Sequence, residues 1–175
     1  MRKFSEGLLD ETTILENLDI RTGQTILNAS CGNGYMAKTF ATLVGDSGNV
    51  YAIDTEIGFI DKLRKEVAGT NIHALVGNIT QTTVLKAASV DLIYLSTVFH
   101  IFSNAKVDGF IEETKRILKP NGRLAVVNLN KEDTPFGPPM EMRTSPEELA
   151  RRLPFACTKL VAAGQYFYMQ LFENR

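Results

Sequence analysis

The chain alternates short apolar runs with segments whose apolar residues recur every three or four positions. The apolar runs predict five strands, and most are apolar throughout, as is typical of strands buried on both faces of a parallel sheet. They lie at Thr25–Ala29, Asn49–Ile53, Ile72–Val76, Val90–Leu95 and Arg123–Leu129. The helical pattern predicts helices at Tyr35–Leu43, Ile57–Val67 and Lys106–Leu118, the last stopped by Pro120-Asn121-Gly122. This alternation of strands and helices indicates βαβ units.

The C-terminal part departs from this alternation. Ser145-Pro146-Glu147-Glu148 predicts the start of a helix, with serine as N-cap, proline at the first helical position and glutamate completing a capping box. Thr158–Ala163 and Tyr166–Glu173 flank Gly164-Gln165 and predict two antiparallel strands joined by a tight turn. Five parallel strands followed by such a hairpin differ from the usual dinucleotide-binding fold, and we expect one domain over residues 1–175.

Polar residues follow the predicted strands at the points where ligands bind open α/β sheets. Ser30-Cys31-Gly32-Asn33-Gly34 follows the first strand, and its glycines let the backbone approach a ligand closely. Asp54 follows the second strand, where a carboxylate can accept hydrogen bonds from ribose hydroxyls. Gly77-Asn78-Ile79 follows the third strand and suits an adenine, and Ser96-Thr97 with His100 follows the fourth. Each of these residues also fits a turn, a helix cap or a structural imidazole, but their joint placement predicts a nucleotide site.

Composition and charge argue against several classes of protein. The 175 residues include 19 Lys+Arg and 20 Asp+Glu, so no basic excess favours binding to nucleic acid. Cys31 and Cys157 are predicted to be free thiols, and the cysteines and histidines have no metal-binding spacing. Acidic residues such as Glu6 and Asp10 interrupt the start of the chain, and no apolar run is long enough to span a bilayer. We therefore expect a cytoplasmic protein without a metal.

Three motifs resemble those of class I S-adenosylmethionine-dependent methyltransferases. Ile26–Gly34 resembles the first motif of that family, Val50–Asp54 resembles the second, and Arg116–Leu124 is similar to the turn before the fifth strand. The resemblance extends from about Leu18 onward. It implies a three-layer α/β sandwich around a seven-stranded, mostly parallel sheet of order 3-2-1-4-5-7-6. The loop Thr134–Arg143 resembles one found in small members of the ubiquinone-biosynthesis and arsenite branch.

The resemblance implies S-adenosylmethionine as cofactor and an unidentified small molecule as methyl acceptor. The cofactor-binding residues that it implies are Asn28, Ser30, Cys31, Gly32, Gly34, Asp54, Thr55, Asn78, Ile79 and Ser96. His100 is the candidate catalytic base, because an imidazole accepts a proton near neutral pH. Further candidates near the acceptor are Glu141, Arg143, Tyr166 and Tyr168.

Three positions depart from the family pattern. Asn28, Ser30 and Asn78 stand where the family usually has Asp, Gly and Asp. The loss of two carboxylates predicts a weaker attraction for the cationic sulfonium of the cofactor. Two alternatives therefore stay open. One is a nicotinamide-dependent oxidoreductase, because Gly32–Ala37 fits G-x-G-x-x-A and Asp54 fits the ribose acid; the other is a non-catalytic protein that still binds the cofactor.

The loop Thr134–Arg143 contains three prolines, which exclude a helix. It follows the fifth strand and therefore emerges on the ligand side of the sheet, where loops often close over ligands. We predict a mobile lid, with a rigid crossover as the alternative. A homodimer in which a second subunit covers the site is a further alternative. We expect no nucleic acid and no membrane as partner.

Overall fold

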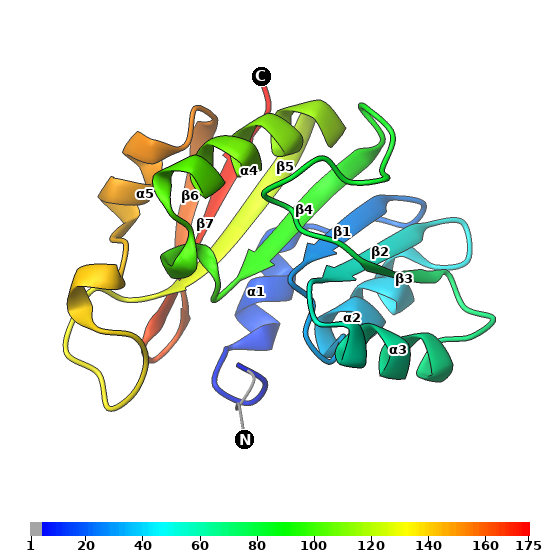
Figure 1. Cartoon of the computed structure of the whole chain (residues 1–175), viewed down its shortest axis with the longest axis horizontal. Helices are drawn as coiled ribbons and strands as arrows, with labels where there is room; N and C mark the ends of the chain where they lie inside the picture. The colour runs from blue at the N-terminus through cyan, green and yellow to red at the C-terminus, as the bar shows by residue number, and fades with distance from the viewer. Residues whose placement is uncertain (1–4) are drawn as a thin grey trace.

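The computed structural model describes residues 5–175 and contains a seven-stranded sheet in the order β3-β2-β1-β4-β5-β7-β6 (Figure 1). The first four residues of the predicted domain lie outside the described part. β1 to β5 run parallel, and β7 pairs antiparallel with both β5 and β6, which confirms the predicted order and the antiparallel hairpin. The strands are β1 (Thr25–Ala29), β2 (Asn49–Asp54), β3 (Ile72–Val76), β4 (Val90–Ser96), β5 (Leu118–Leu129), β6 (Ala156–Gly164) and β7 (Phe167–Glu173).

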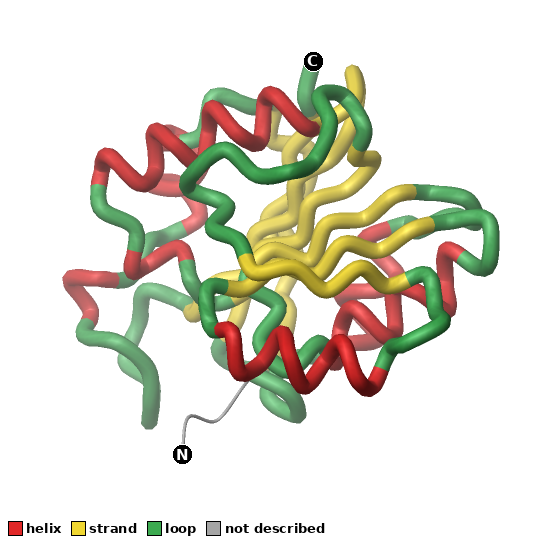
Figure 2. The backbone as a smooth tube through the Cα atoms, turned by 45° about the vertical axis from the view of Figure 1, so that its right-hand side comes forward, coloured by secondary structure: helices red, strands yellow, loops and turns green. Residues whose placement is uncertain are grey.

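Helices cover both faces of this sheet (Figure 2). One face carries α1 (Glu11–Leu18), α2 (Tyr35–Val44) and α3 (Ile57–Glu66). The other carries α4 (Asn104–Ile117) and α5 (Pro146–Arg152), and two 3-10 turns, η1 (Phe99–Ile101) and η2 (Met140–Met142), lie in the loops. None of the helices within residues 5–175 is both long enough and apolar enough to cross a membrane.

Burial on both faces explains why the strands are apolar throughout. Successive side chains of a strand point to opposite faces. On β1, Ile26 therefore packs in the core beneath α1–α3, with Phe40 of α2, whereas Leu27 packs in the core beneath α4 and α5, with Phe110 of α4. All four side chains are fully buried. At about 25 cal/mol per Å² of apolar surface, each stabilises the fold by roughly 1.5–3 kcal/mol.

The fifth strand begins earlier than predicted. Leu118 pairs with Val90, and the pairing shifts register before it resumes at Arg123 opposite Leu92. Asn121 takes a left-handed φ of 60° and donates its backbone N–H to Asn174 O at 2.8 Å. The Pro-Asn-Gly segment thus ends the helix, as predicted, and its backbone also pairs with the C-terminal end of the chain.

Helix α1 was not predicted from the sequence. Asp10 caps it by accepting a hydrogen bond from the Thr13 backbone N–H at 3.0 Å. Ile14 and Leu18 are buried, and the preceding segment is tied to β6 by a hydrogen bond from Asp10 N to Ala163 O at 2.8 Å. This segment therefore brings N-terminal residues to the ligand edge of the sheet.

Candidate functional site

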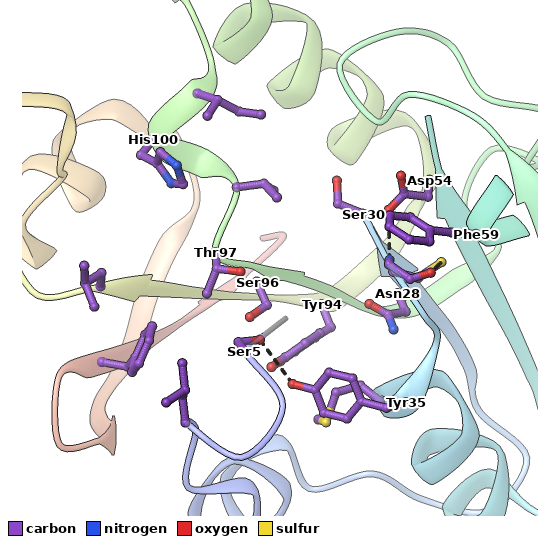
Figure 3. A pocket seen from close by; sticks show the side chains of 18 of the residues that line it. Ser5, Asn28, Ser30, Tyr35, Asp54, Phe59, Tyr94, Ser96, Thr97 and His100 are labelled. Atoms are coloured by element: carbon purple, nitrogen blue, oxygen red, sulfur yellow. Dashed lines mark hydrogen bonds between the residues drawn. The ribbon is translucent and has the colours of Figure 1, made fainter. Parts of the chain in front are cut away.

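The carboxyl ends of β1, β2 and β4 open into a cavity of about 420 Å³ (Figure 3). The loops that follow these strands form part of its wall. Segments that are remote in sequence also contribute, among them the N-terminal segment with Ser5 and Leu8, the loop after β5 with residues 136–138, and Phe167 of β7. Of the predicted cofactor-binding residues, seven line the cavity: Asn28, Ser30, Cys31, Gly32, Asp54, Thr55 and Ser96.

The loop after β1 is a tight turn that needs left-handed backbone angles. Ser30, Gly32 and Gly34 have φ values of 58°, 55° and 77°. This conformation costs a residue with a Cβ roughly 1–2 kcal/mol, so Ser30 holds strain that glycine would not. Gly34 is not a lining residue, and a Cβ built on it would lie 2.6 Å from Leu63 Cδ1. Gly34 therefore serves the packing of α2 against α3.

Asp54 joins this loop to the loop after β2. Its Oδ2 accepts a hydrogen bond from Gly32 N at 2.8 Å, and its Oδ1 accepts one from Glu56 N at 3.0 Å. The carboxylate is partly exposed on the cavity wall (Figure 3). Each carboxylate oxygen has a further acceptor direction, so Asp54 can bind hydroxyl groups of a ligand while it holds both loops.

Polar side chains from β1 and β4 form the floor of the cavity. Asn28 and Tyr94 are paired in register on these neighbouring strands, and Ser96 follows on the same face of the sheet. The Tyr94 hydroxyl and Ser96 Oγ are buried, and neither has a partner in hydrogen-bonding geometry within residues 5–175. A buried polar group without a partner costs about 1–3 kcal/mol, which favours a polar ligand here.

Burial also affects the ionisable groups of this wall. It raises the pKa of Tyr94. It also raises the pKa of Tyr35, because its effect is larger than the lowering caused by the hydrogen bond between the Tyr35 hydroxyl and Ser5 Oγ at 3.2 Å. Burial, with the charge of Asp54, raises the pKa of Cys31 to about 12. Cys31 is therefore a neutral thiol near pH 7, and lacks the thiolate that a nucleophile requires.

Asn78 and Ile79 are predicted adenine contacts that do not line the cavity. Asn78 Oδ1 accepts hydrogen bonds from Thr80 N at 2.9 Å and Thr80 Oγ1 at 2.8 Å. Ile79 is buried in the core beneath α4 and α5. The polar residue after β3 thus forms a turn with its own neighbour.

His100, the predicted base, lies on η1 and points towards the cavity (Figure 3). It also lines a second cavity, of about 640 Å³, which includes Glu141 but not Asp54. The structure therefore places His100 between the two spaces. Glu141 is exposed on η2 and belongs only to the second.

The two tyrosines predicted near the acceptor line neither cavity. The Tyr168 hydroxyl donates to Thr144 O at 2.7 Å and accepts from Asn128 Nδ2 at 3.1 Å. Burial raises the pKa of Tyr168 to about 12. Tyr166 packs edge-on against Phe136, with ring centroids 5.5 Å apart. Both tyrosines are structural in this arrangement.

Arg143 organises the loop that was predicted to be a lid. Its guanidinium donates to the carbonyl oxygens of Asn130, Glu132, Phe136 and Pro138, at distances of 2.6–3.2 Å. The loop is therefore held to one side chain at several points along its length. These bonds favour a fixed connection over free motion of single residues, and the lid stays a prediction.

Several wall residues were missed from the sequence. The cavity is also lined by aromatic residues from five separate segments: Tyr35, Phe59, Tyr94, Phe136 and Phe167. Aromatic residues in apolar runs signal only burial, so the pattern gives no reason to select them. Thr97, already noted after the fourth strand, has a φ of 59°, which is rare for a β-branched residue and gives the wall a second strained position beside Ser30.

Comparison with known proteins adds independent evidence. Residues 26–122 match the family described as "Methyltransferase domain". The chain is 30% identical over 135 residues to an uncharacterized methyltransferase of Schizosaccharomyces pombe, covering 77% of this chain and 48% of that protein. It is 27% identical over 126 residues to a ubiquinone/menaquinone biosynthesis C-methyltransferase of Hahella chejuensis, covering 70% and 49%. The chain thus spans about half the length of these two relatives.

A solved structure agrees over nearly the whole chain. The crystal structure of a SAM-dependent methyltransferase from Aquifex aeolicus superimposes with a TM-score of 0.87 at 27% sequence identity. The superposition covers 98% of this chain and 93% of that one. The hairpin after β5 is therefore part of the shared fold, although it lies beyond the matched residues 26–122.

Proposed function

Because this chain belongs to the class I S-adenosylmethionine-dependent methyltransferase family, we propose that it transfers a methyl group from that cofactor to a small-molecule acceptor. The observation that carries the proposal is the position of Asp54. Its carboxylate joins the loops after β1 and β2 at the edge of a cavity and retains acceptor capacity towards that cavity.

The residues of the cavity fit the cofactor. A volume of about 420 Å³ lies within the range of small-molecule sites. We propose that Asp54 binds the ribose hydroxyls and that the backbone of Ser30–Gly32, with Thr55, contacts the nucleoside. Asn28, Tyr94 and Ser96 offer polar partners for the amino-acid end. Gly34, Asn78 and Ile79 support the site through the shapes of their turns.

S-adenosylmethionine, when bound, supplies an electrophilic methyl group. The protein then contributes mainly proximity and orientation, which explains a site without a catalytic triad. Where the acceptor must lose a proton, His100 is placed to accept it at the entrance between the two cavities. Phe136, Phe167 and Leu8 add apolar surface to the cavity wall.

The departures from the family pattern change the charge of the site but keep its polar character. Asn28 carries no charge, and the buried hydroxyls of Tyr94 and Ser96 add two neutral partners next to it. We propose that binding is retained at reduced affinity. The oxidoreductase alternative is not retained, because the family match concerns methyltransferases.

Calorimetric titration tests this function directly. S-adenosylhomocysteine and S-adenosylmethionine should bind with a stoichiometry of one, and NAD should not bind. Tyr94→Phe should weaken binding of S-adenosylhomocysteine, whereas Tyr168→Phe, which alters a buried hydroxyl away from the cavity, should leave the affinity unchanged. Binding of NAD without binding of S-adenosylhomocysteine would overturn the proposal.

Turnover is measured separately by following the formation of S-adenosylhomocysteine with candidate acceptors. The Hahella relative makes an aromatic quinone precursor one acceptor to assay. His100→Gln should lower turnover at pH 7 while the affinity for S-adenosylhomocysteine stays within about twofold. Tight binding with no turnover on any acceptor class would favour the non-catalytic alternative.

A further inference from the structure

The second cavity adjoins the first at His100 and has a different character. Its wall is formed by η1, the start of α4, the segment around η2, and α5. Four cationic side chains line it, Lys131, Arg143, Arg151 and Arg152, against two carboxylates, Glu141 and Glu148. The chain as a whole has a formal net charge of -1, so this concentration of positive charge is local.

The two arginines of α5 form no direct ion pair within the described residues, although the charge of Arg151 helps to lower the pKa of the Glu147 and Glu148 carboxyls on the same helix. Lys131 Nζ forms an ion pair with Glu148 Oε1 at 2.6 Å, so these two side chains neutralise each other. Within the described range, neither Arg151 nor Arg152 has a carboxylate oxygen within 4 Å. Arg152 lies over the Phe99 ring, 5.2 Å from its centroid, and donates to Asn104 Oδ1 at 3.3 Å. These contacts fix the guanidinium without neutralising it.

Arg143 adds a buried positive charge beneath this cavity. The residue is only 8% exposed, and its printed partners are the four carbonyl oxygens of the loop. Charged side chains are almost never buried without a counter-charge. Carbonyl dipoles stabilise the guanidinium but leave its net charge, and no carboxylate of residues 5–175 lies within 4 Å of it.

We propose that the second cavity binds an anionic group of the methyl acceptor, a carboxylate or a phosphate. The forked donors of Arg151 and Arg152 match the paired oxygens of either group. An acceptor held there extends past His100, and its reacting atom lies in the first cavity. The inference rests on the proposed methyl transfer, because it assigns the first cavity to the cofactor and the second to the acceptor.

The test titrates the full chain with simple probes and follows backbone and arginine side-chain NMR signals. Sodium benzoate and sodium phosphate are added at constant ionic strength, with benzamide as the uncharged counterpart of benzoate. Benzoate, phosphate or both should shift the signals of Ser103, Asn104 and the Arg151 and Arg152 side chains, and benzamide should not. The stronger of the two anions identifies the acceptor group as carboxylate or phosphate.

Variants separate the cavity from general charge. Arg151→Gln and Arg152→Gln should each weaken anion binding at least tenfold. Lys65→Gln removes one positive charge from the exposed side of α3 and should change the anion affinity less than twofold. Equal effects of the three variants, binding of benzamide as tight as that of benzoate, or no shift with either anion would overturn the inference.

The same samples are titrated with S-adenosylhomocysteine, which keeps the two proposals distinguishable. Binding of S-adenosylhomocysteine without anion binding would reject the anionic subsite and leave methyl transfer standing. Anion binding without binding of S-adenosylhomocysteine would reject the proposed function and, with it, the assignment of the anion as part of a methyl acceptor.

Discussion

Asp54→Ala perturbs two loops and one ligand contact at once. The change removes the acceptors of the Gly32 N–H at 2.8 Å and of the Glu56 N–H at 3.0 Å. The first of these bonds is partly buried and the second is exposed, so water replaces the second more easily than the first. We expect a loss of about 1–3 kcal/mol in the free energy of unfolding, mostly from the Gly32 bond. A loss of 2 kcal/mol lowers the Tm by about 4–8 °C for a domain of this size.

The effect on ligand binding adds to this loss. Two ribose hydroxyls would lose a charged acceptor, which we expect to cost about 1–3 kcal/mol, or roughly 5–150-fold in the affinity for S-adenosylhomocysteine. Asp54→Asn should give an intermediate affinity, because one acceptor oxygen is kept and the charge is lost. Calorimetric titration gives the affinity, and thermal unfolding of the same samples gives the stability.

Asp91→Ala is the matched control. Asp91 is also a partly buried carboxylate that holds backbone, since it accepts from Thr25 N at 2.8 Å and from Lys119 Nζ at 2.9 Å. It lies at the amino end of β4, beside the first residue of β1, and so at the opposite edge of the sheet from the cavity. Its replacement should lower the Tm and leave the affinity unchanged. An affinity for S-adenosylhomocysteine within twofold of the parent protein in folded Asp54→Ala would refute the assignment of Asp54.

Three further outcomes follow from the site. Asn28→Asp combined with Ser30→Gly should tighten binding of S-adenosylmethionine, because it restores a carboxylate and relieves a left-handed serine; unchanged or weaker binding in calorimetry would show a site adapted to its present residues. Iodoacetamide at pH 8 should label exposed Cys157 and spare Cys31, whose pKa is about 12 and whose exposure is 6%; peptide mass spectrometry showing equal labelling would contradict the burial argument. Hydrogen exchange in residues 134–143 should slow when S-adenosylhomocysteine is added if the loop closes as a lid, whereas equal rates would leave a fixed connector.

The parts of the fold that follow from local pattern were predictable from the sequence. β1 and β3 have the predicted bounds. β1 is almost entirely buried and gives a continuous apolar run, which is typical of a strand covered on both faces. The capping box at Ser145 is present with both reciprocal bonds, since it depends only on residues three apart. The hairpin also depends on neighbours in sequence and was confirmed.

The parts that depend on remote contacts were not predictable. α1 has only eight residues and is stabilised by tertiary contacts, including the hydrogen bond that joins the preceding segment to β6. In the sequence, Tyr94 looks like one more residue of an apolar strand. Only the strand register shows that it lies beside Asn28 on the cavity floor. Asn78 has the right residue type for an adenine contact, yet its oxygen is used by Thr80. Such choices between a local turn and a ligand are decided only by the folded chain.

The four acceptors of Arg143 are all main-chain carbonyls, which are present whatever side chain the loop residue carries. One guanidinium therefore holds the course of the loop through main-chain atoms, which any residue at these positions would supply. Phe136 lines the first cavity and Met142 the second, so their replacement alters the lining of each cavity while the bonds to Arg143 stay in place. Gly137 is the exception, because its φ is 104° and a Cβ would collide with Leu129. Single substitutions in this loop can thus change the lining of a cavity and leave the scaffold intact.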